Sequence, residues 1–173
     1  MNLIGQNARK ASLEKINTKI KNNVLKKYTS LLNKEKNSIL KANAKDVKFA
    51  IKKRLKNNLI DRLIVDQDTL NNIRSSINKI IKLKDPIDNT LEKWNRPNGL
   101  KINKVSIPIG VIGVIYESRP NVTSDVAALC FKSGNAVILK GGSEAINTNK
   151  ILAKLFRKAL KESNVNKNFI QFV

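Results

Sequence analysis

The last third of the chain alternates apolar segments with helix-forming segments, and this order constrains the fold more than any other feature. Ile109–Tyr116 is a nearly continuous apolar run, Ala136–Lys140 is a second, and Phe169–Val173 begins a third. Apolar runs of this length are typical of strands covered on both faces. The short connections between them predict right-handed crossovers and a parallel βαβαβ sheet. Because the chain stops on a strand, we expect this sheet to be incomplete.

Each connection between these strands contains a predicted helix with a polar start. Thr123 or Ser124 is predicted to cap the first helix, with Asp125 in its first turn, and Gly134 to end it in the left-handed conformation. Ser143 is predicted to cap the second helix in the same way.

The residues that follow the first two strands are the candidate functional residues. In a parallel sheet the carboxyl ends of the strands meet at one edge, so Glu117–Thr123 and Lys140–Glu144 should face each other across a crevice. Asn121 could donate a hydrogen bond to an oxyanion, or it could simply cap the helix. Lys140 and the glycines that follow it suit a phosphate group. However, their spacing matches neither the dinucleotide fingerprint nor a Walker loop.

The first half of the chain has helical periodicity. Apolar residues recur at three- and four-residue steps through residues 8–84, and Asp66 or Asp68 could cap the last of these helices. Pro86 should end that helix, since proline disfavours helix at the residue before it. Gly99–Val105 alternates apolar and polar residues, which predicts a half-buried strand. The predicted fold class is therefore α/β, with N-terminal helices followed by the incomplete parallel sheet.

The formal charge of +21 raises the alternative of a nucleic-acid-binding module. The chain has 27 lysines but only 7 arginines, whereas contacts to bases and phosphates favour the bidentate guanidinium. Its few aromatic residues are scattered and form no stacking ladder among the basic ones. We therefore predict no nucleic-acid partner, and a basic binding module or a non-catalytic interaction module stays an alternative.

Several classes of site are excluded by composition. The chain has no histidine and one cysteine, Cys130, which excludes an internal disulfide and Ser–His or Cys–His dyads and argues against structural zinc. Cys130 lies within an apolar helical segment, so it is predicted to be a small buried hydrophobic residue. The longest uncharged stretch, Val105–Tyr116, is twelve residues long and too short to cross a membrane. With no secretory signal in the first twenty residues, a metal-free cytoplasmic protein is expected.

Four segments resemble the gamma-glutamyl phosphate reductases, which are glutamate-5-semialdehyde dehydrogenases of the aldehyde dehydrogenase superfamily. The most specific are YESRPNVT at Tyr116–Thr123 and SGNAVILKGGSEA at Ser133–Ala145. Trp94–Leu100 also matches, and Ile39–Asp46 matches more weakly. The resemblance covers the chain from about residue 10 onward.

This resemblance implies an NADP-dependent reduction of L-glutamyl 5-phosphate to the 5-semialdehyde, with release of phosphate, in proline biosynthesis. Asn121 matches the asparagine that stabilises the oxyanion, and Lys140 matches the lysine that contacts the cofactor ribose. Gly142, Ser143 and Glu144 would complete the cofactor site. Whether Ser143 or Glu144 contacts the ribose stays open, and so does the preference for NADPH over NADH. Arg119 is assigned to an anionic group of substrate or cofactor.

The resemblance also implies a division of the chain. Residues 1–97 would be the helical part of the cofactor domain, 98–106 a strand of an oligomerisation hairpin, and 107–173 an incomplete Rossmann-like NADP-binding core. Family members are more than twice as long, and their nucleophilic cysteine lies in a segment that this chain does not reach. We therefore expect an N-terminal fragment that is inactive alone. The full-length enzyme is expected to be a homo-oligomer and a possible partner of glutamate 5-kinase.

Overall fold

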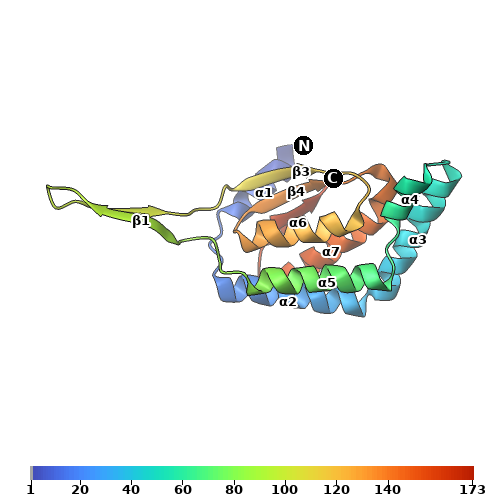
Figure 1. Ribbon diagram of the computed structural model, residues 1–173, viewed down its shortest axis with the longest axis horizontal. Coiled ribbons are helices and arrows are strands. Elements are labelled where there is room, and N and C mark those ends of the chain that lie inside the picture. Colours follow the sequence, from blue (N-terminus) through green and yellow to red (C-terminus); the bar gives the residue numbers. More distant parts are fainter. Residues whose placement is uncertain (1) are drawn as a thin grey trace.

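The computed structural model describes residues 2–173 and confirms the predicted α/β class. Figure 1 shows a body built on a small sheet, from which a two-stranded ribbon extends into solvent. The helices are α1 (Asn2–Ser12), α2 (Thr18–Lys34), α3 (Lys36–Lys52), α4 (Asn57–Leu63), α5 (Gln67–Lys82), α6 (Pro120–Lys132) and α7 (Ile146–Lys161); the strands are β1 (Thr90–Asn95), β2 (Lys101–Val105), β3 (Val111–Ile115), β4 (Ala136–Lys140) and β5 (Ile170–Phe172); η1 (Ser143–Ala145) and η2 (Lys167–Phe169) are 3-10 turns.

The sheet has the predicted parallel topology. β4 lies between β3 and β5 and pairs in parallel with both, with Ile115 opposite Lys140 and Val137 opposite Ile170. β4 is largely buried, as expected. The expectation that β3 is covered on both faces is wrong, because β3 is an edge strand whose Ile115 side chain is 83% exposed.

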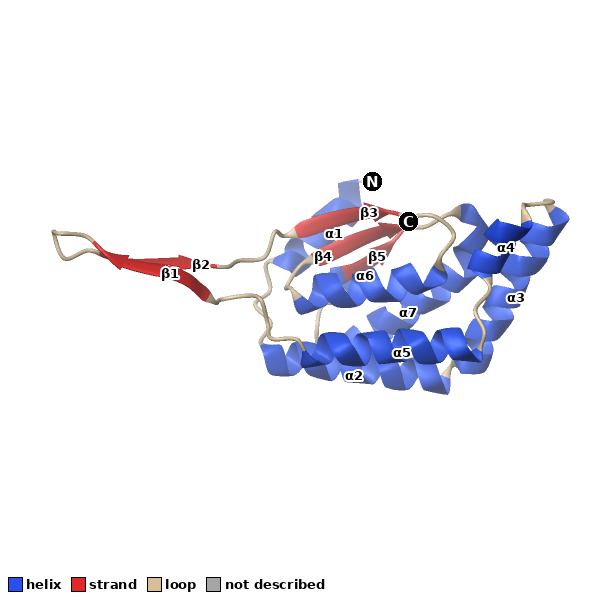
Figure 2. Cartoon of the chain, viewed as in Figure 1, coloured by secondary structure: helices blue, strands red, loops and turns tan. Residues whose placement is uncertain are grey.

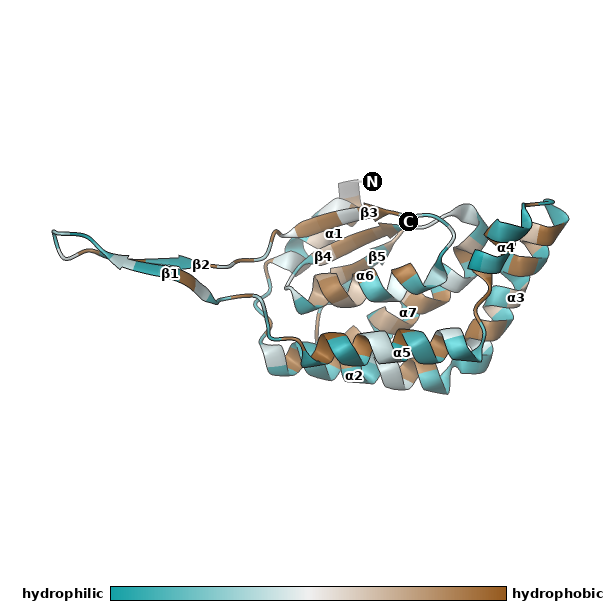
Figure 3. Ribbon diagram, in the orientation of Figure 1, coloured by the Kyte–Doolittle hydropathy of each residue, from teal (hydrophilic) through white to brown (hydrophobic). Residues whose placement is uncertain are grey.

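The body is layered around this sheet (Figure 2). α1 contacts one face of the sheet, α6 and α7 contact the other face, and α2 and α5 cover α6 and α7. Four fully buried aromatic side chains, from Tyr28, Phe131, Phe156 and Phe169, join these layers. In Figure 3 the strands of the sheet are mostly hydrophobic, whereas the ribbon and the outer helix faces are largely hydrophilic.

The predicted helices of the first half are present, and their ends follow local signals. Asp66 caps α5, since its Oδ1 accepts a 2.7 Å hydrogen bond from the backbone N–H of Thr69. α5 ends at Lys82, before Pro86, as predicted.

The ribbon formed by β1 and β2 departs from the sequence prediction in two ways. The segment up to residue 97 is not helical throughout, since Thr90–Asn95 forms a strand antiparallel to β2. β2 is not half-buried, because the ribbon projects away from the body and only Ile102 is partly covered. The turn between the strands places Gly99 at φ +85°, a left-handed conformation that favours glycine.

Asp85 connects the start of α2 to the base of the ribbon. Its carboxylate accepts hydrogen bonds from Lys21 Nζ (2.9 Å), Thr18 Oγ1 (2.8 Å) and the backbone N–H of Ile87 (3.1 Å). Its backbone carbonyl accepts one from the side chain of Asn89 at 2.6 Å. The Lys21 and Asp85 side chains are only 3% and 11% exposed, so this ion pair is largely withdrawn from water.

We expect Asp85→Asn to lower the free energy of unfolding at pH 7 by about 1–3 kcal/mol. Burial alone would raise the pKa of Asp85, but its hydrogen bonds and the charge of Lys21 outweigh burial and hold the pKa below its usual value. The stabilisation is therefore complete above the unfolded-chain pKa of about 3.9 and is lost as the pH falls through the lower folded pKa. The free energy of unfolding, measured with urea across the acid range, should depend less steeply on pH in Asp85→Asn than in the unchanged chain. The same dependence on pH in both proteins would contradict this assignment.

Candidate functional site

The turns that follow β3 and β4 lie side by side at the carboxyl edge of the sheet, which confirms their predicted juxtaposition. The backbone N–H of Tyr116 donates a 3.1 Å hydrogen bond to the carbonyl of Lys140. The hydroxyl of Ser118 donates to the carboxylate of Glu144, so a side-chain contact also joins the two turns. Ligands of open parallel sheets bind at this edge.

Gly141 allows these two turns to pack closely. A Cβ at this position would lie 2.3 Å from Asn149 Nδ2 and 3.0 Å from the ring of Tyr116. The hydroxyl of Thr123 lies 2.6 Å from that of Tyr116 and donates to Asn149 Oδ1 at 2.9 Å. Burial raises the pKa of Tyr116, although its contact with Thr123 acts in the opposite direction. Asn149 is fully buried on α7, and no sequence motif points to it.

Glu144 is turned toward the β3–α6 connection. Its Oε1 accepts from Ser118, and its Oε2 lies 3.3 Å from the hydroxyl of Ser143. A Cβ on Gly142 would lie 2.3 Å from Oε1, so the carboxylate lies directly over that glycine. Partial burial alone would raise the pKa of Glu144, but the hydrogen bonds from Ser118, from its own backbone N–H and from Ser143 together outweigh burial and lower the pKa. Ser118 itself is only 4% exposed, and its position between Glu117 and Arg119 predicts no role for it.

Asn121 lies in the first turn of α6, at the end that faces this edge. Its amide nitrogen lies 3.4 Å from Asp125 Oδ2, one helical turn further on. The prediction that Thr123 or Ser124 caps α6 is wrong, because the helix already begins at Pro120. Proline is favoured at the first helical position, where its missing N–H leaves no hydrogen bond unmade.

Lys140 and Arg119 are the exposed cations of this edge. Lys140 ends β4 and Arg119 precedes α6, and neither forms an ion pair within residues 2–173. Both side chains are therefore available to an anionic ligand.

The N-terminus of α7 is capped by a carboxylate from α3. Asp46 Oδ1 accepts from the backbone N–H and the side chain of Asn147, at 3.1 and 2.7 Å. Its Oδ2 accepts from the backbone N–H and hydroxyl of Thr148, at 2.8 and 2.7 Å. The predicted cap by Ser143 is wrong, since Ser143 opens η1 and caps nothing. Because Asp46 already neutralises this helix end, a ligand phosphate at the edge would depend on the cationic side chains.

Cys130 is a buried helix residue, as predicted. Its side chain is 8% exposed, and burial raises the pKa of the thiol to about 11. A thiol of this kind is almost entirely protonated at neutral pH and is not an activated nucleophile.

Within residues 2–173, no helix is both long and apolar enough to cross a bilayer. In the same residues, no three side chains of His, Cys, Asp or Glu are grouped as metal ligands would be.

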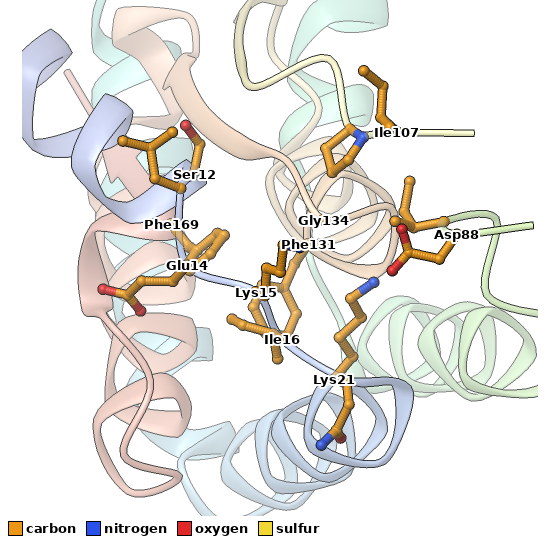
Figure 4. Close-up of a pocket in the computed structure, with 14 residues that line it drawn as sticks. Ser12, Glu14, Lys15, Ile16, Lys21, Asp88, Ile107, Phe131, Gly134 and Phe169 are labelled. Carbon is orange, nitrogen blue, oxygen red and sulfur yellow. The ribbon is translucent and has the colours of Figure 1, made fainter. Parts of the chain in front are cut away.

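A cavity of about 460 Å³ lies at the opposite, amino edge of the sheet (Figure 4). Phe131 and Phe169 contribute its apolar wall, and Gly134 lines it at the end of α6. Its charged lining residues are Lys15, Lys21, Glu14 and Asp88, so positive and negative charges are equal in number and it offers no excess of positive charge for phosphate.

The side chains of the carboxyl edge fit a phosphorylated dinucleotide. They comprise two cations that form no ion pair within residues 2–173, the exposed hydroxyl of Ser143 and the carboxylate of Glu144, which lies over Gly142. Cations suit phosphate, and hydroxyl and carboxylate groups suit ribose.

Comparisons with known proteins agree on one family. No family model matches the chain. Gamma-glutamyl phosphate reductase from Ruthia magnifica is 44% identical over 172 residues, which is 98% of this chain and 41% of that protein. The Nitratiruptor enzyme of the same name is 48% identical over 153 residues, 88% of this chain and 37% of its own length. The chain thus spans about two fifths of the length of these relatives.

Solved structures give the same result. The crystal structure of gamma-glutamyl phosphate reductase from Thermotoga maritima matches 99% of this chain with a TM-score of 0.96 and 37% identity, over 42% of that enzyme. The Saccharomyces cerevisiae enzyme matches with a TM-score of 0.92 and 32% identity, over 99% of this chain and 45% of its own. Propionaldehyde dehydrogenase from Rhodopseudomonas palustris, at 13% identity and a TM-score of 0.67, covers 99% of this chain and 36% of its own; it shares the fold. These matches do not favour a nucleic-acid-binding or non-catalytic module.

Proposed function

Because this chain belongs to the gamma-glutamyl phosphate reductase family, we propose that it forms the cofactor-binding part of an NADPH-dependent oxidoreductase. The substrate would be L-glutamyl 5-phosphate, and the products L-glutamate 5-semialdehyde and phosphate, as in proline biosynthesis. The observation that carries the proposal is the meeting of the two turns at the carboxyl edge, with Lys140 exposed beside the Gly141–Gly142 turn.

The residues of the β4–α7 turn are proposed to hold the adenosine end of the cofactor. Lys140 would contact the ribose and its phosphate, and Gly142, Ser143 and Glu144 would line the same end. Bound NADPH supplies the hydride that reduces the acyl carbon. Support comes from the exposure of Lys140 and Ser143 and from the occupied N-terminus of α7, which leaves phosphate to the side-chain cations.

Asn121 is proposed to stabilise negative charge on the acyl oxygen. An amide nitrogen carries two hydrogens, so a bond to Asp125 orients the group and leaves one hydrogen for the oxyanion. Arg119, exposed just before α6, is proposed to hold an anionic group of substrate or cofactor.

The thiolate that would displace phosphate is proposed to come from outside residues 1–173. The family resemblance implies that the reaction uses a cysteine thiolate as its nucleophile. Cys130 is unsuited to this role, because it is buried and its thiol pKa is raised. We therefore expect the chain to bind nucleotide but not to complete the reaction alone.

The same proposal includes the setting of the enzyme. A cytoplasmic homo-oligomer is proposed, and so is its association with glutamate 5-kinase. The ribbon is the proposed oligomer contact, since it exposes apolar side chains in the part of the chain that the structure describes; these are Leu91, Trp94, Leu100 and Val105.

We expect Lys140→Ala to weaken binding of adenosine 2′,5′-bisphosphate, the 2′-phosphorylated end of NADPH, by about tenfold. A hydrogen bond to a charged group contributes about 1.5–3 kcal/mol, and tenfold corresponds to about 1.4 kcal/mol. Calorimetric titration of the chain measures the affinity. Lys101→Ala removes the same charge from the exposed ribbon, and at equal salt its affinity for the bisphosphate should stay within about twofold of that of the unchanged chain. Failure of the unchanged chain to bind, or equal losses in both variants, would contradict the proposed cofactor site.

A further inference from the structure

One carboxylate at the proposed cofactor site is held by a neighbouring turn. Glu144 lies four residues after Lys140, yet its side chain bends back over Gly142 and accepts a hydrogen bond from Ser118. Ser118 belongs to the β3–α6 turn and is 4% exposed, so its hydroxyl has little access to water. The hydrogen bond therefore fixes the half-buried Glu144 against the β3–α6 turn.

The position of the Glu144 carboxylate determines how much negative charge lies beside Lys140. In dinucleotide sites an acidic side chain at the ribose accepts hydrogen bonds from the 2′-hydroxyl, and a cation at the same place accommodates a 2′-phosphate. A free carboxylate beside Lys140 would repel a 2′-phosphate and offset the lysine charge. With the Glu144 carboxylate held by Ser118, the exposed charges of the two turns are the cations Lys140 and Arg119 and one carboxylate, Glu117.

The N-terminus of α7 would not take over from those cations. The first N–H groups of α7, which could otherwise bind phosphate, already donate to Asp46. A further negative charge released beside Lys140 would therefore weaken recognition of a 2′-phosphate at this edge.

We infer that Ser118 is a specificity-determining residue that sets the preference for a 2′-phosphorylated cofactor by holding the Glu144 carboxylate against the β3–α6 turn, so that it does not pair with Lys140. Ser118 itself does not touch the cofactor and acts as a positioning residue. The inference rests on the proposed function, because it requires a dinucleotide at the carboxyl edge.

The test compares two probes on the 173-residue chain, adenosine 2′,5′-bisphosphate and adenosine 5′-monophosphate. The ratio of their affinities measures the preference for the 2′-phosphate. In Ser118→Ala, Glu144 is released, and we expect this ratio to fall by about tenfold. Ser118→Thr keeps the hydroxyl and should retain the original ratio. Adding Glu144→Gln to Ser118→Ala removes the released charge and should restore most of the preference.

A matched control is available on α3, where Ser38 donates to Glu35 at 3.1 Å on the exposed surface. Ser38→Ala breaks a serine–glutamate pair far from the edge and should leave the ratio unchanged. A nucleotide-independent readout is the pKa of Glu144, followed by carboxyl carbon NMR. This pKa should rise in Ser118→Ala, because the hydrogen bond that lowers it is lost.

The outcomes separate this inference from the proposed function. If both probes bind and Ser118→Ala leaves their ratio unchanged, the inference is wrong and the cofactor site stands. If neither probe binds the unchanged chain, the proposed site is wrong and the inference fails with it. Should Ser118→Ala not fold, Ser118→Cys, which keeps the size but is a weaker donor, should lower the ratio by a smaller factor. An unchanged ratio in that variant would equally overturn the inference.

Discussion

Asp46→Ala should lower the free energy of unfolding by about 3–5 kcal/mol. The carboxylate is 1% exposed and accepts four hydrogen bonds from Asn147 and Thr148, two of them from the backbone N–H groups that begin α7. Without it the backbone N–H and hydroxyl of the fully buried Thr148 lose their acceptor, and each buried donor without an acceptor costs about 1–3 kcal/mol, whereas the exposed Asn147 can turn to water. The helix end also loses the negative charge that stabilises its dipole.

Urea unfolding followed by circular dichroism measures the effect of Asp46→Ala. Asp61→Ala is the matched control, since Asp61 is exposed on α4 and its loss should change stability by less than about 0.5 kcal/mol. Asp46→Asn should also destabilise, because the new amide places a donor opposite existing donors. Equal stability of the two alanine variants would show that the carboxylate does not anchor α7.

Phe156→Ala should also lower the free energy of unfolding by about 3–5 kcal/mol, through the cavity it leaves. Phe156 is fully buried on α7, its ring centroid 4.5 Å from that of Tyr28 and 6.0 Å from that of Phe131. Phe131 in turn packs edge-on against Phe169 at 5.4 Å. Removing the central ring therefore opens the contact between α2, α6 and α7 at once.

The matched control for Phe156→Ala is Phe49→Ala, because the Phe49 side chain is 49% exposed on α3. Phe49→Ala should lower the free energy of unfolding far less than Phe156→Ala does. Phe156→Leu keeps most of the side-chain volume and should lower it by about 1.5 kcal/mol or less. Chemical denaturation compares the variants, provided that the dependence of the unfolding free energy on denaturant concentration is the same for all of them. Similar losses for Phe49→Ala and Phe156→Ala would contradict the assigned core.

The parallel sheet and its ligand-binding edge could be predicted because their signals are local. Apolar runs such as Ala136–Lys140 are legible in the sequence, and the order of strands and helices leaves one handedness for each crossover. That geometry places the turns after β3 and β4 at the same edge whatever their side chains are. The candidate residues Lys140 and Asn121 follow from this placement, and their roles stay predictions.

The predicted helix starts were wrong where several residues satisfied the same pattern. Thr123, Ser124 and Ser143 all have the chemistry of a cap, but α6 begins at Pro120 and α7 takes its cap from elsewhere. The proline was a usable signal, since it favours the first helical position. β1 was missed because the ribbon buries neither face, so Thr90–Asn95 carries no pattern of buried residues.

By itself the sequence determined the α/β class, the parallel strand order and the two turns that form the proposed site. Periodicity, turn residues and crossover handedness act between neighbours in the chain, so they can be read from it. Only the tertiary structure decided that Asp46 caps a helix a hundred residues later and that Ser118 holds Glu144. Such contacts follow no fixed spacing in the sequence, because a hydrogen bond between distant segments depends on how the layers pack.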